Sequence, residues 1–196
     1  MPRTAEANKL IRDKRAKQIL QVALRLFCLE EYEKVPMDRI AKEAHISHGL
    51  IYHYFSQKSD ILKALLEEAK QKFNAIFEID EMREKKGYDF FEYLTNFIIS
   101  TISLGTDYSY YLALILSFKI GSNSRPSFEN LDHFKQLEEN FVEGQKEGKF
   151  APGNPRDYIL CYLYLIYAIV YGSILSNGRN IVPPLNVIMN VLKRSD

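Results

Sequence analysis

Apolar side chains recur along most of this chain every three or four residues, the spacing that places them on one face of an α-helix. The clearest stripe lies in residues 58–80. It consists of Leu62, Leu65, Leu66, Ala69, Phe73, Ile76 and Phe77. We find no segment with the strict apolar–polar alternation that is typical of a half-buried strand. The pattern therefore predicts an all-α fold.

The same spacing predicts nine helices. Their approximate ranges are 8–30, 37–44, 48–54, 58–80, 87–104, 107–120, 126–147, 155–176 and 184–194. Segments rich in Gly, Pro, Ser and Asn separate the later helices at 121–126 and 148–155. Such residues favour turns and interrupt helices.

Charge is distributed unevenly along the chain, although its formal net charge is only +1. Residues 1–58 carry 11 Lys and Arg against 7 Asp and Glu, whereas the remaining residues carry 15 against 18. A basic first third with an acidic remainder suits a DNA-binding head on a body that does not touch DNA. A chance asymmetry is the alternative interpretation.

Several other classes of protein find no support in the sequence. There is no metal-ligand spacing, disulfide framework, phosphate loop or nucleophile–base pair, so we expect neither an enzyme nor a cofactor. Cys28 and Cys161 lie far apart among apolar residues and are expected to be buried thiols. The start of the chain lacks the apolar core of a signal peptide, which predicts a cytoplasmic protein. The apolar run 158–171 is shorter than the roughly 20 residues of a bilayer span, so we expect a buried helix and no membrane.

The most informative segment is 35–62, where two short helices are separated by a tight turn. The first helix has an apolar face of Met37, Ile40, Ala41 and Ala44, and His45–Ile46 forms the turn. Ser47 is positioned to cap the second helix. The residues expected to hold that helix inward are Ile46, Leu50, Ile51 and Phe55. Two short helices joined in this way form a helix-turn-helix, here spanning residues 36–58.

The second helix would then offer its remaining surface to the major groove of DNA, which is wide enough to admit a helix. That surface comprises His48, Gly49, Tyr52, His53 and Tyr54. Gly49 weakens a helix but allows the backbone to approach a base edge or a phosphate. Tyr52, Tyr54 and Lys58 supply donors for phosphates. For His48 and His53, the alternative is that they are ordinary surface residues.

A longer pattern now gives a family resemblance. It consists of Ile19, Ala23, Leu26-Phe27, Tyr32, Ile40-Ala41, Ala44, Ile46-Ser47, Gly49, Tyr52, Tyr54-Phe55, Lys58 and Leu62. This pattern resembles the N-terminal domain of the TetR (tetracycline repressor) family of bacterial regulators. The resemblance implies a DNA-binding head of residues 1–57 and an effector-binding and dimerisation domain of residues 58–196.

The resemblance also implies roles for single residues. Residues 47–54 would form the recognition helix. Phosphate contacts would come from Ser47, Tyr52, Tyr54 and Lys58, and base contacts from His48, Gly49 and His53, with Leu50 available for a thymine methyl group. Three positions depart from the family pattern. Glu31 and His45 replace the usual glycines, and Val35–Pro36 replaces the usual Ser or Thr cap of the first short helix.

The C-terminal two-thirds is rich in aromatic residues, which at helical spacing are first of all core residues. The resemblance implies that some of them line an effector cavity, and aromatic rings with hydroxyl tips suit an apolar or amphipathic ligand. The candidates are Phe73, Phe77, Phe97, Tyr108, Tyr111, Phe118, Phe134, Tyr162 and Tyr167.

The helix predicted at 155–176 is apolar on two faces, so it must be buried on both. Pairing of the last two helices with those of a second copy would bury the outer face, as in the TetR family. The candidate interface residues are Tyr164, Tyr171, Leu175, Val187 and Val191.

The sequence therefore predicts a homodimeric repressor that a small apolar or amphipathic ligand releases from a palindromic operator. One alternative is a DNA-binding regulator that responds to a protein partner or to no effector. A more remote alternative is a carrier or an enzyme built on a helical bundle.

Overall fold

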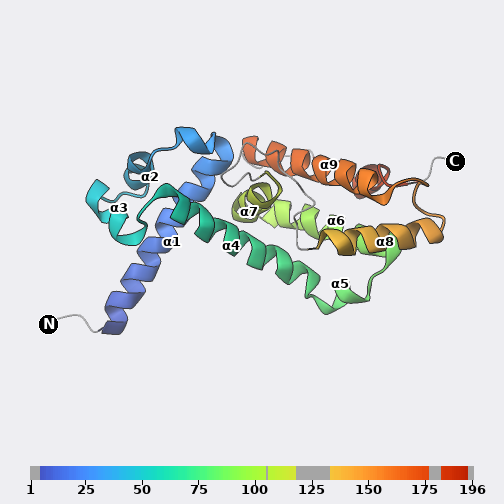
Figure 1. Ribbon diagram of the computed structural model, residues 1–196, viewed down its shortest axis with the longest axis horizontal. Helices are drawn as coiled ribbons and strands as arrows, with labels where there is room; N and C mark the ends of the chain where they lie inside the picture. The colour runs from blue at the N-terminus through green and yellow to red at the C-terminus, as the bar shows by residue number, and fades with distance from the viewer. Residues whose placement is uncertain (1–4, 105, 118–132, 177–181, 194–196) are drawn as a thin grey trace. The chain divides into compact units, whose positions relative to one another are not determined.

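The computed structural model describes residues 5–104, 106–117, 133–176 and 182–193 (Figure 1). Its elements are α1 (Ala5–Leu29), the 3-10 helix η1 (Tyr32–Lys34), α2 (Met37–Glu43), α3 (His48–Tyr54), α4 (Lys58–Phe77), α5 (Asp80–Glu84), α6 (Gly87–Leu104), α7 (Thr106–Ser117), α8 (Phe134–Lys146), α9 (Pro155–Leu175) and α10 (Leu185–Met189). The all-α prediction is confirmed.

The described residues contain ten α-helices where nine were expected. The additional one is the short α5, which follows directly after α4 and lies where a break between two helices was expected. The helix predicted at 126–147 is described from Phe134 onward, and its earlier part lies outside the described residues. The last helix is shorter than expected and ends at Met189.

The chain divides into two compact units, Met1–Ala69 and Lys70–Asp196, and the division falls within α4. In the first unit, the core forms where α1, α2, α3 and the first half of α4 turn their apolar faces inward. Its fully buried side chains include Ile19, Ile40, Ile51, Ile61 and Leu65. Leu65 belongs to the apolar stripe that the sequence predicted in residues 58–80.

The core of the second unit is built largely from aromatic rings. Phe91 of α6 meets Phe150 and Tyr162 edge to face, with ring centroids 5.4 Å apart in both pairs. Phe141 of α8 stacks on Phe150 at 4.9 Å. Edge-to-face and offset-stacked arrangements are those that aromatic rings favour. These rings therefore act as packed core.

A buried hydroxyl pair connects α6 and α9 within this core. The Thr95 hydroxyl donates to the Phe91 carbonyl at 2.6 Å and lies 2.8 Å from the Tyr162 hydroxyl. Since the Thr95 hydroxyl has a single proton, Tyr162 donates in the second bond. Burial raises the pKa of Tyr162 above its ordinary value, so its hydroxyl remains a donor at neutral pH.

Two glycines allow α8 to approach its neighbours closely. A Cβ atom on Gly144 would lie 2.3 Å from the ring of the buried Phe150. Gly87 opens α6 with a φ of 53°, and a Cβ there would collide with the Glu147 carboxylate. That carboxylate accepts a hydrogen bond from the Tyr88 amide, and Asn140 accepts one from the Gly87 amide. The start of α6 is therefore capped by side chains that follow α8 or belong to it.

α9 starts at a well-formed cap and is strongly apolar after its first turn. The Asn154 side chain accepts a hydrogen bond from the Arg156 amide, and Pro155 occupies the first helical position, which suits its fixed φ. By length and composition α9 is the one described helix that could cross a membrane, and 39% of its most apolar window is buried in the protein.

Candidate nucleic-acid interface

The turn between α2 and α3 is a Schellman motif. The His45 amide donates to the Lys42 carbonyl at 3.1 Å, and the Ile46 amide donates to the Ala41 carbonyl at 3.0 Å. The motif requires a left-handed residue after the helix, and His45 has a φ of 53°. His45 stands where the TetR pattern has a glycine, the residue that adopts this conformation without strain.

Two side chains fix this turn in place. Gln18 of α1 donates from its amide to the Ala44 carbonyl at 2.9 Å, so α1 satisfies an otherwise orphaned group at the end of α2. Ser47 accepts a hydrogen bond from the Leu50 amide, which confirms the predicted cap of α3. At the start of α2, by contrast, Pro36 supplies no side-chain cap. Glu31 has an extended backbone, so glycine is not required there.

α3 is anchored by one fully buried side chain, Ile51, with help from the half-buried Ile46 and Phe55. The prediction that Leu50 also faces inward is wrong, because its side chain is 37% exposed. Leu50 instead belongs to the outer face of α3. That face also includes His48, Gly49, Tyr52 and His53 as exposed residues, while Tyr54 is half-buried.

Gly49 has no structural role within the described chain. No atom lies within 4 Å of the position that a Cβ would take, so packing does not demand a glycine there. The open space lies outside the protein, on the face of α3 that carries His48 and His53. A glycine in an exposed helix lowers helix stability and leaves the backbone accessible to a ligand.

His48 contacts a residue of α2. Its Nδ1 atom pairs with the carboxylate of Asp38, and both side chains are about two-thirds exposed. The His48 ring also lies against Tyr52, with ring centroids 5.1 Å apart. Sequence reasoning did not identify Asp38, because a single carboxylate ten residues before His48 carries no recognisable spacing.

Lys58, at the start of α4, is engaged by the protein itself. Its Nζ atom donates to the carbonyl of Tyr32 at 2.6 Å and lies 4.2 Å from the centre of the Tyr32 ring. Partial burial lowers the pKa of Lys58, and the nearby Glu33 opposes that shift. In the free protein, this lysine ties α4 to the carbonyl groups of η1.

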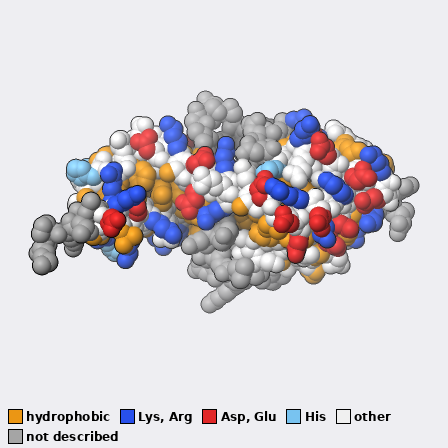
Figure 2. All heavy atoms as spheres, turned by 90° about the horizontal axis from the view of Figure 1, so that it is seen from below, with side chains coloured by type: hydrophobic (Ala, Val, Ile, Leu, Met, Phe, Trp, Pro, Cys, Tyr) orange, Lys and Arg blue, Asp and Glu red, His pale blue; other side chains and the backbone are white. Residues whose placement is uncertain are grey.

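The first unit carries further exposed basic residues outside α3. The basic residues in the first part of α1 are all exposed, and they are Lys9, Arg12, Lys14, Arg15 and Lys17. Figure 2 shows Lys, Arg and His side chains among acidic and hydrophobic side chains on the surface of this unit. Part of the acidic charge is paired, since Arg39 binds both Glu30 and Glu43.

The comparisons with known proteins agree with this geometry. Residues 19–65, which hold the helix-turn-helix and its supports, match the model of the bacterial regulatory proteins of the tetR family. Residues 19–65 are therefore similar to the N-terminal domain of TetR-family regulators. This match confirms the family resemblance seen in the first third of the sequence.

Two curated proteins are similar to parts of this chain. The HTH-type transcriptional regulator HbdR of Aromatoleum sp. (strain CIB) is 44% identical over 54 residues, 28% of this chain and 23% of that protein. The nucleoid occlusion factor SlmA of Haemophilus ducreyi is 31% identical over 71 residues, 36% of this chain and 35% of that protein. The matches thus span about a quarter and a third of these relatives.

Solved structures extend the likeness of fold over most of the chain. The structure of AibR in complex with isovaleryl coenzyme A and operator DNA matches with a TM-score of 0.61 and 19% identity. It covers 90% of this chain and 94% of that one. The MbdR regulator from Azoarcus sp. CIB matches with a TM-score of 0.63 and 21% identity, over 91% and 97% of the two chains. Both therefore support a TetR-like fold for the second unit as well.

The predicted ligand-pocket residues lie in different environments. Phe77, Tyr111, Phe134 and Tyr162 are buried, whereas Phe97 and Tyr167 are half-buried. The side chains of Phe73 and Tyr108 are not described, and Phe118 lies outside the described residues. Because the Tyr162 hydroxyl is bonded to Thr95, it is already satisfied without a ligand.

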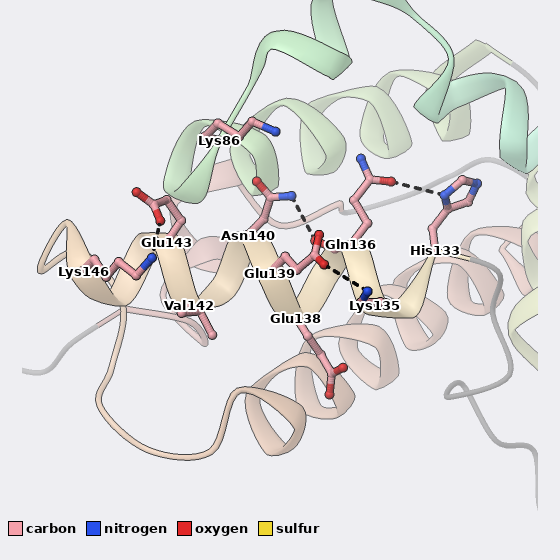
Figure 3. A pocket seen from close by; sticks show the side chains of 10 residues that line it. All are labelled: Lys86, His133, Lys135, Gln136, Glu138, Glu139, Asn140, Val142, Glu143 and Lys146. Carbon is pink, nitrogen blue, oxygen red and sulfur yellow. Dashed lines mark hydrogen bonds and ion pairs between the residues drawn. The ribbon is translucent and has the colours of Figure 1, made fainter.

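A hollow of about 1020 Å³ lies along the outer side of α8, and none of the nine predicted residues lines it (Figure 3). Its lining is mainly charged or amide-bearing and includes Lys86, Gln136, Glu139 and Lys146. His133, at one end, stacks on the predicted pocket residue Phe77, with ring centroids 3.9 Å apart. The hollow is thus a polar surface feature, unlike the aromatic pocket that the sequence predicted.

The predicted dimer-interface residues lie at the surface of the second unit. Tyr164 and Leu175 of α9 are 54% and 60% exposed, and Val187 is exposed too. Tyr171 and Val191 are half-buried. The two cysteines differ: Cys28 is buried, which raises its pKa to about 12, whereas Cys161 is exposed on α9. The prediction that both thiols are buried is wrong for Cys161.

The left-handed conformation of His45 leads to a prediction about stability. Replacing His45 by Gly should raise the free energy of unfolding by about 0.5–1 kcal/mol, because glycine adopts a positive φ without strain and the exposed ring loses no packing. The matched control is His53→Gly in α3, which should lower it by a similar amount because its backbone is helical. Urea denaturation of both variants would measure the difference. Equal signs for the two variants would contradict this account of the turn.

Proposed function

We propose that this protein is a cytoplasmic, homodimeric DNA-binding repressor that a small amphipathic ligand releases from a palindromic operator. The observation that carries the proposal is the outer face of α3. This face is exposed and carries polar and aromatic residues. On the opposite side, α3 is held by the buried Ile51, and its start is fixed by the Ser47 cap and the Schellman turn. A short helix held in this way can enter a major groove as a rigid reader.

The residues of this face suit the two kinds of contact that operator binding requires. His48, Gly49 and His53 would contact base edges. Leu50, whose side chain is exposed, would be available to contact a thymine methyl group. Ser47, Tyr52 and Tyr54 would position the helix on phosphates. Lys58 would contact a phosphate from the start of α4 while it remains bonded to the Tyr32 carbonyl, since an ammonium group has three donors.

The exposed face of α9 supports the homodimer. This α9 outer stripe consists of Cys161, Tyr164, Ala168, Gly172 and Leu175, all exposed and uncharged. The only charged residues of α9 lie in its first turn. An uncharged stripe of this length on a soluble protein is typical of a protein–protein contact. A two-fold pairing through it would place two copies of α3 on successive turns of DNA.

Response to a small ligand is supported by an unsatisfied group in the second unit. The Ser109 hydroxyl of α7 is buried, and it has no hydrogen-bond partner among the described residues. A buried polar atom of this kind calls for an explanation, and a ligand with a polar group would supply one. The fold neighbour AibR was solved with isovaleryl coenzyme A and operator DNA. By linkage, a ligand that weakens DNA binding is itself bound more weakly in the presence of DNA.

The second candidate is a DNA-binding regulator that responds to a protein partner. It is favoured by the dense aromatic core, in which Tyr162 bonds Thr95 and Phe91 packs between Phe150 and Tyr162. A filled core leaves less room for an effector. The polar hollow along α8 would then serve a different purpose from ligand sensing.

The first prediction from this proposal concerns DNA binding. Selection from a random duplex library at about 50 mM salt should enrich a two-fold symmetric site with half-sites about 34–36 Å apart. Affinity should fall steeply with salt because phosphate contacts release counterions. Tyr52→Asp, which places a charge on the outer face of α3, should weaken binding at least tenfold. Failure to enrich any sequence, with no mobility shift at low salt, would refute the DNA-binding function.

The second prediction concerns assembly. Tyr164→Asp should yield monomers in sedimentation equilibrium, because the pairing would bury two uncompensated charges in the α9 outer stripe. Tyr52→Asp is the matched control: it makes the same substitution at another exposed tyrosine and should remain dimeric while losing DNA affinity. A dimer formed by Tyr164→Asp would exclude this stripe as the interface.

The third prediction concerns the ligand. Short-chain acyl-CoA thioesters should raise the melting temperature of the wild type and weaken its DNA binding, since a ligand at 100 times its Kd stabilises the folded state by about 2.7 kcal/mol. Ser109→Ala should leave the stability of the free protein nearly unchanged and reduce the ligand-induced shift. If neither melting nor DNA binding responds to any thioester, control by a protein partner is favoured.

A further inference from the structure

The recognition helix carries a histidine whose ring is held by the neighbouring helix. Asp38 lies in the first turn of α2, and His48 is the first residue of α3. The carboxylate of Asp38 pairs with Nδ1 of His48, so the two short helices share a hydrogen bond on their outer side. The Tyr52 ring, 5.1 Å from the His48 ring, limits its rotation.

The chemistry of the pair determines where the ring proton lies. An ionised carboxylate can only accept hydrogen bonds, so Nδ1 of His48 must be the donor. In a neutral imidazole, one nitrogen carries the proton and the other is an acceptor. Contact with Asp38 therefore leaves Nε2 of His48 as a lone-pair acceptor on the opposite side of the ring.

Stability does not account for this pair. Both partners are about two-thirds exposed, and polar contacts between exposed side chains, even charged ones, add little to folding. An acidic side chain near bound DNA also repels phosphates, so Asp38 would be unfavourable at this place without a second role. Setting the hydrogen-bonding character of His48 is such a role.

We propose that Asp38 is a positioning residue that fixes the tautomer of His48 and thereby the base that His48 reads. With Nε2 as the acceptor, His48 selects a base that offers an amino group in the major groove, which is cytosine or adenine. With the opposite tautomer, Nε2 would donate and would favour guanine or thymine oxygen. The base contact in this inference rests on the proposed DNA-binding function, whereas the tautomer of His48 does not.

The first test uses the free full-length protein and requires no DNA. Nitrogen-15 NMR of the histidine rings at pH 8, well above the range in which free histidine titrates, reports which nitrogen is protonated. The signal of His48 is assigned by its loss in His48→Phe. We expect Nδ1 to carry the proton in the wild type and the Nε2-protonated form to increase in Asp38→Asn. A wild-type His48 protonated at Nε2 would overturn the inference.

Glu31→Gln is the matched control for both tests. The Glu31 side chain is 67% exposed, against 68% for Asp38, and it is paired with Lys34 within η1, not with a residue of α3. This variant removes the same charge from the same unit. It should leave the His48 signal and the base preference as in the wild type.

The second test measures the affinity for operators with each base substituted in turn. The wild type should prefer cytosine or adenine at one position of each half-site. His48→Phe and Asp38→Asn should each lower that preference about tenfold, and the double variant should lower it no further. A uniform gain in affinity for all operators in Asp38→Asn, with the preference intact, would show a charge effect alone and would overturn the inference. Absence of DNA binding by the wild type would instead refute the proposed function, and the NMR result would stand by itself.

Discussion

The reversal of the chain after α2 determines what the first unit can present. Two backbone hydrogen bonds close the turn, His45 adopts the left-handed conformation, and Gln18 reaches from α1 to the Ala44 carbonyl. With the turn fixed, Ser47 falls at the cap of α3 and Ile51 falls into the core. A seven-residue helix has too few hydrogen bonds to be stable alone, so its orientation derives from these contacts. The exposed face of α3 and the pair of His48 with Asp38 depend on the same turn.

Much of the structure of this unit could be predicted from the sequence, because its helices and caps depend on residues close together in the chain. A serine before a short apolar period predicts a cap, and Ser47 is that cap. Leu50 was misplaced for a physical reason. A short helix against a small core can bury only a narrow stripe, and Ile51 with the flanking Ile46 and Phe55 already fills it. The contacts of Asp38 and Gln18 depend on the angle between helices, which no local pattern encodes.

For the second unit, the sequence predicted most of the helices but not which of their residues line a ligand site. Aromatic residues at helical spacing are compatible with a packed core and with a cavity wall, and only three-dimensional packing separates the two. Tyr162 is the clear case, since its hydroxyl could have pointed at a ligand but bonds the Thr95 hydroxyl of α6. Ser109, a small residue without any sequence signature, is instead a buried polar group that lacks a partner among the described residues. The exposure of Cys161 was equally hidden, because α9 is apolar on every side.

The α9 outer stripe has a consequence for how such a regulator would respond to its own abundance. If two copies must dimerise through this stripe before either can bind DNA, operator occupancy rises with the square of the chain concentration while monomers predominate. Halving the number of chains would then reduce occupancy about fourfold, in keeping with mass action. A fall in the concentration of the chain would therefore lower operator occupancy more than in proportion.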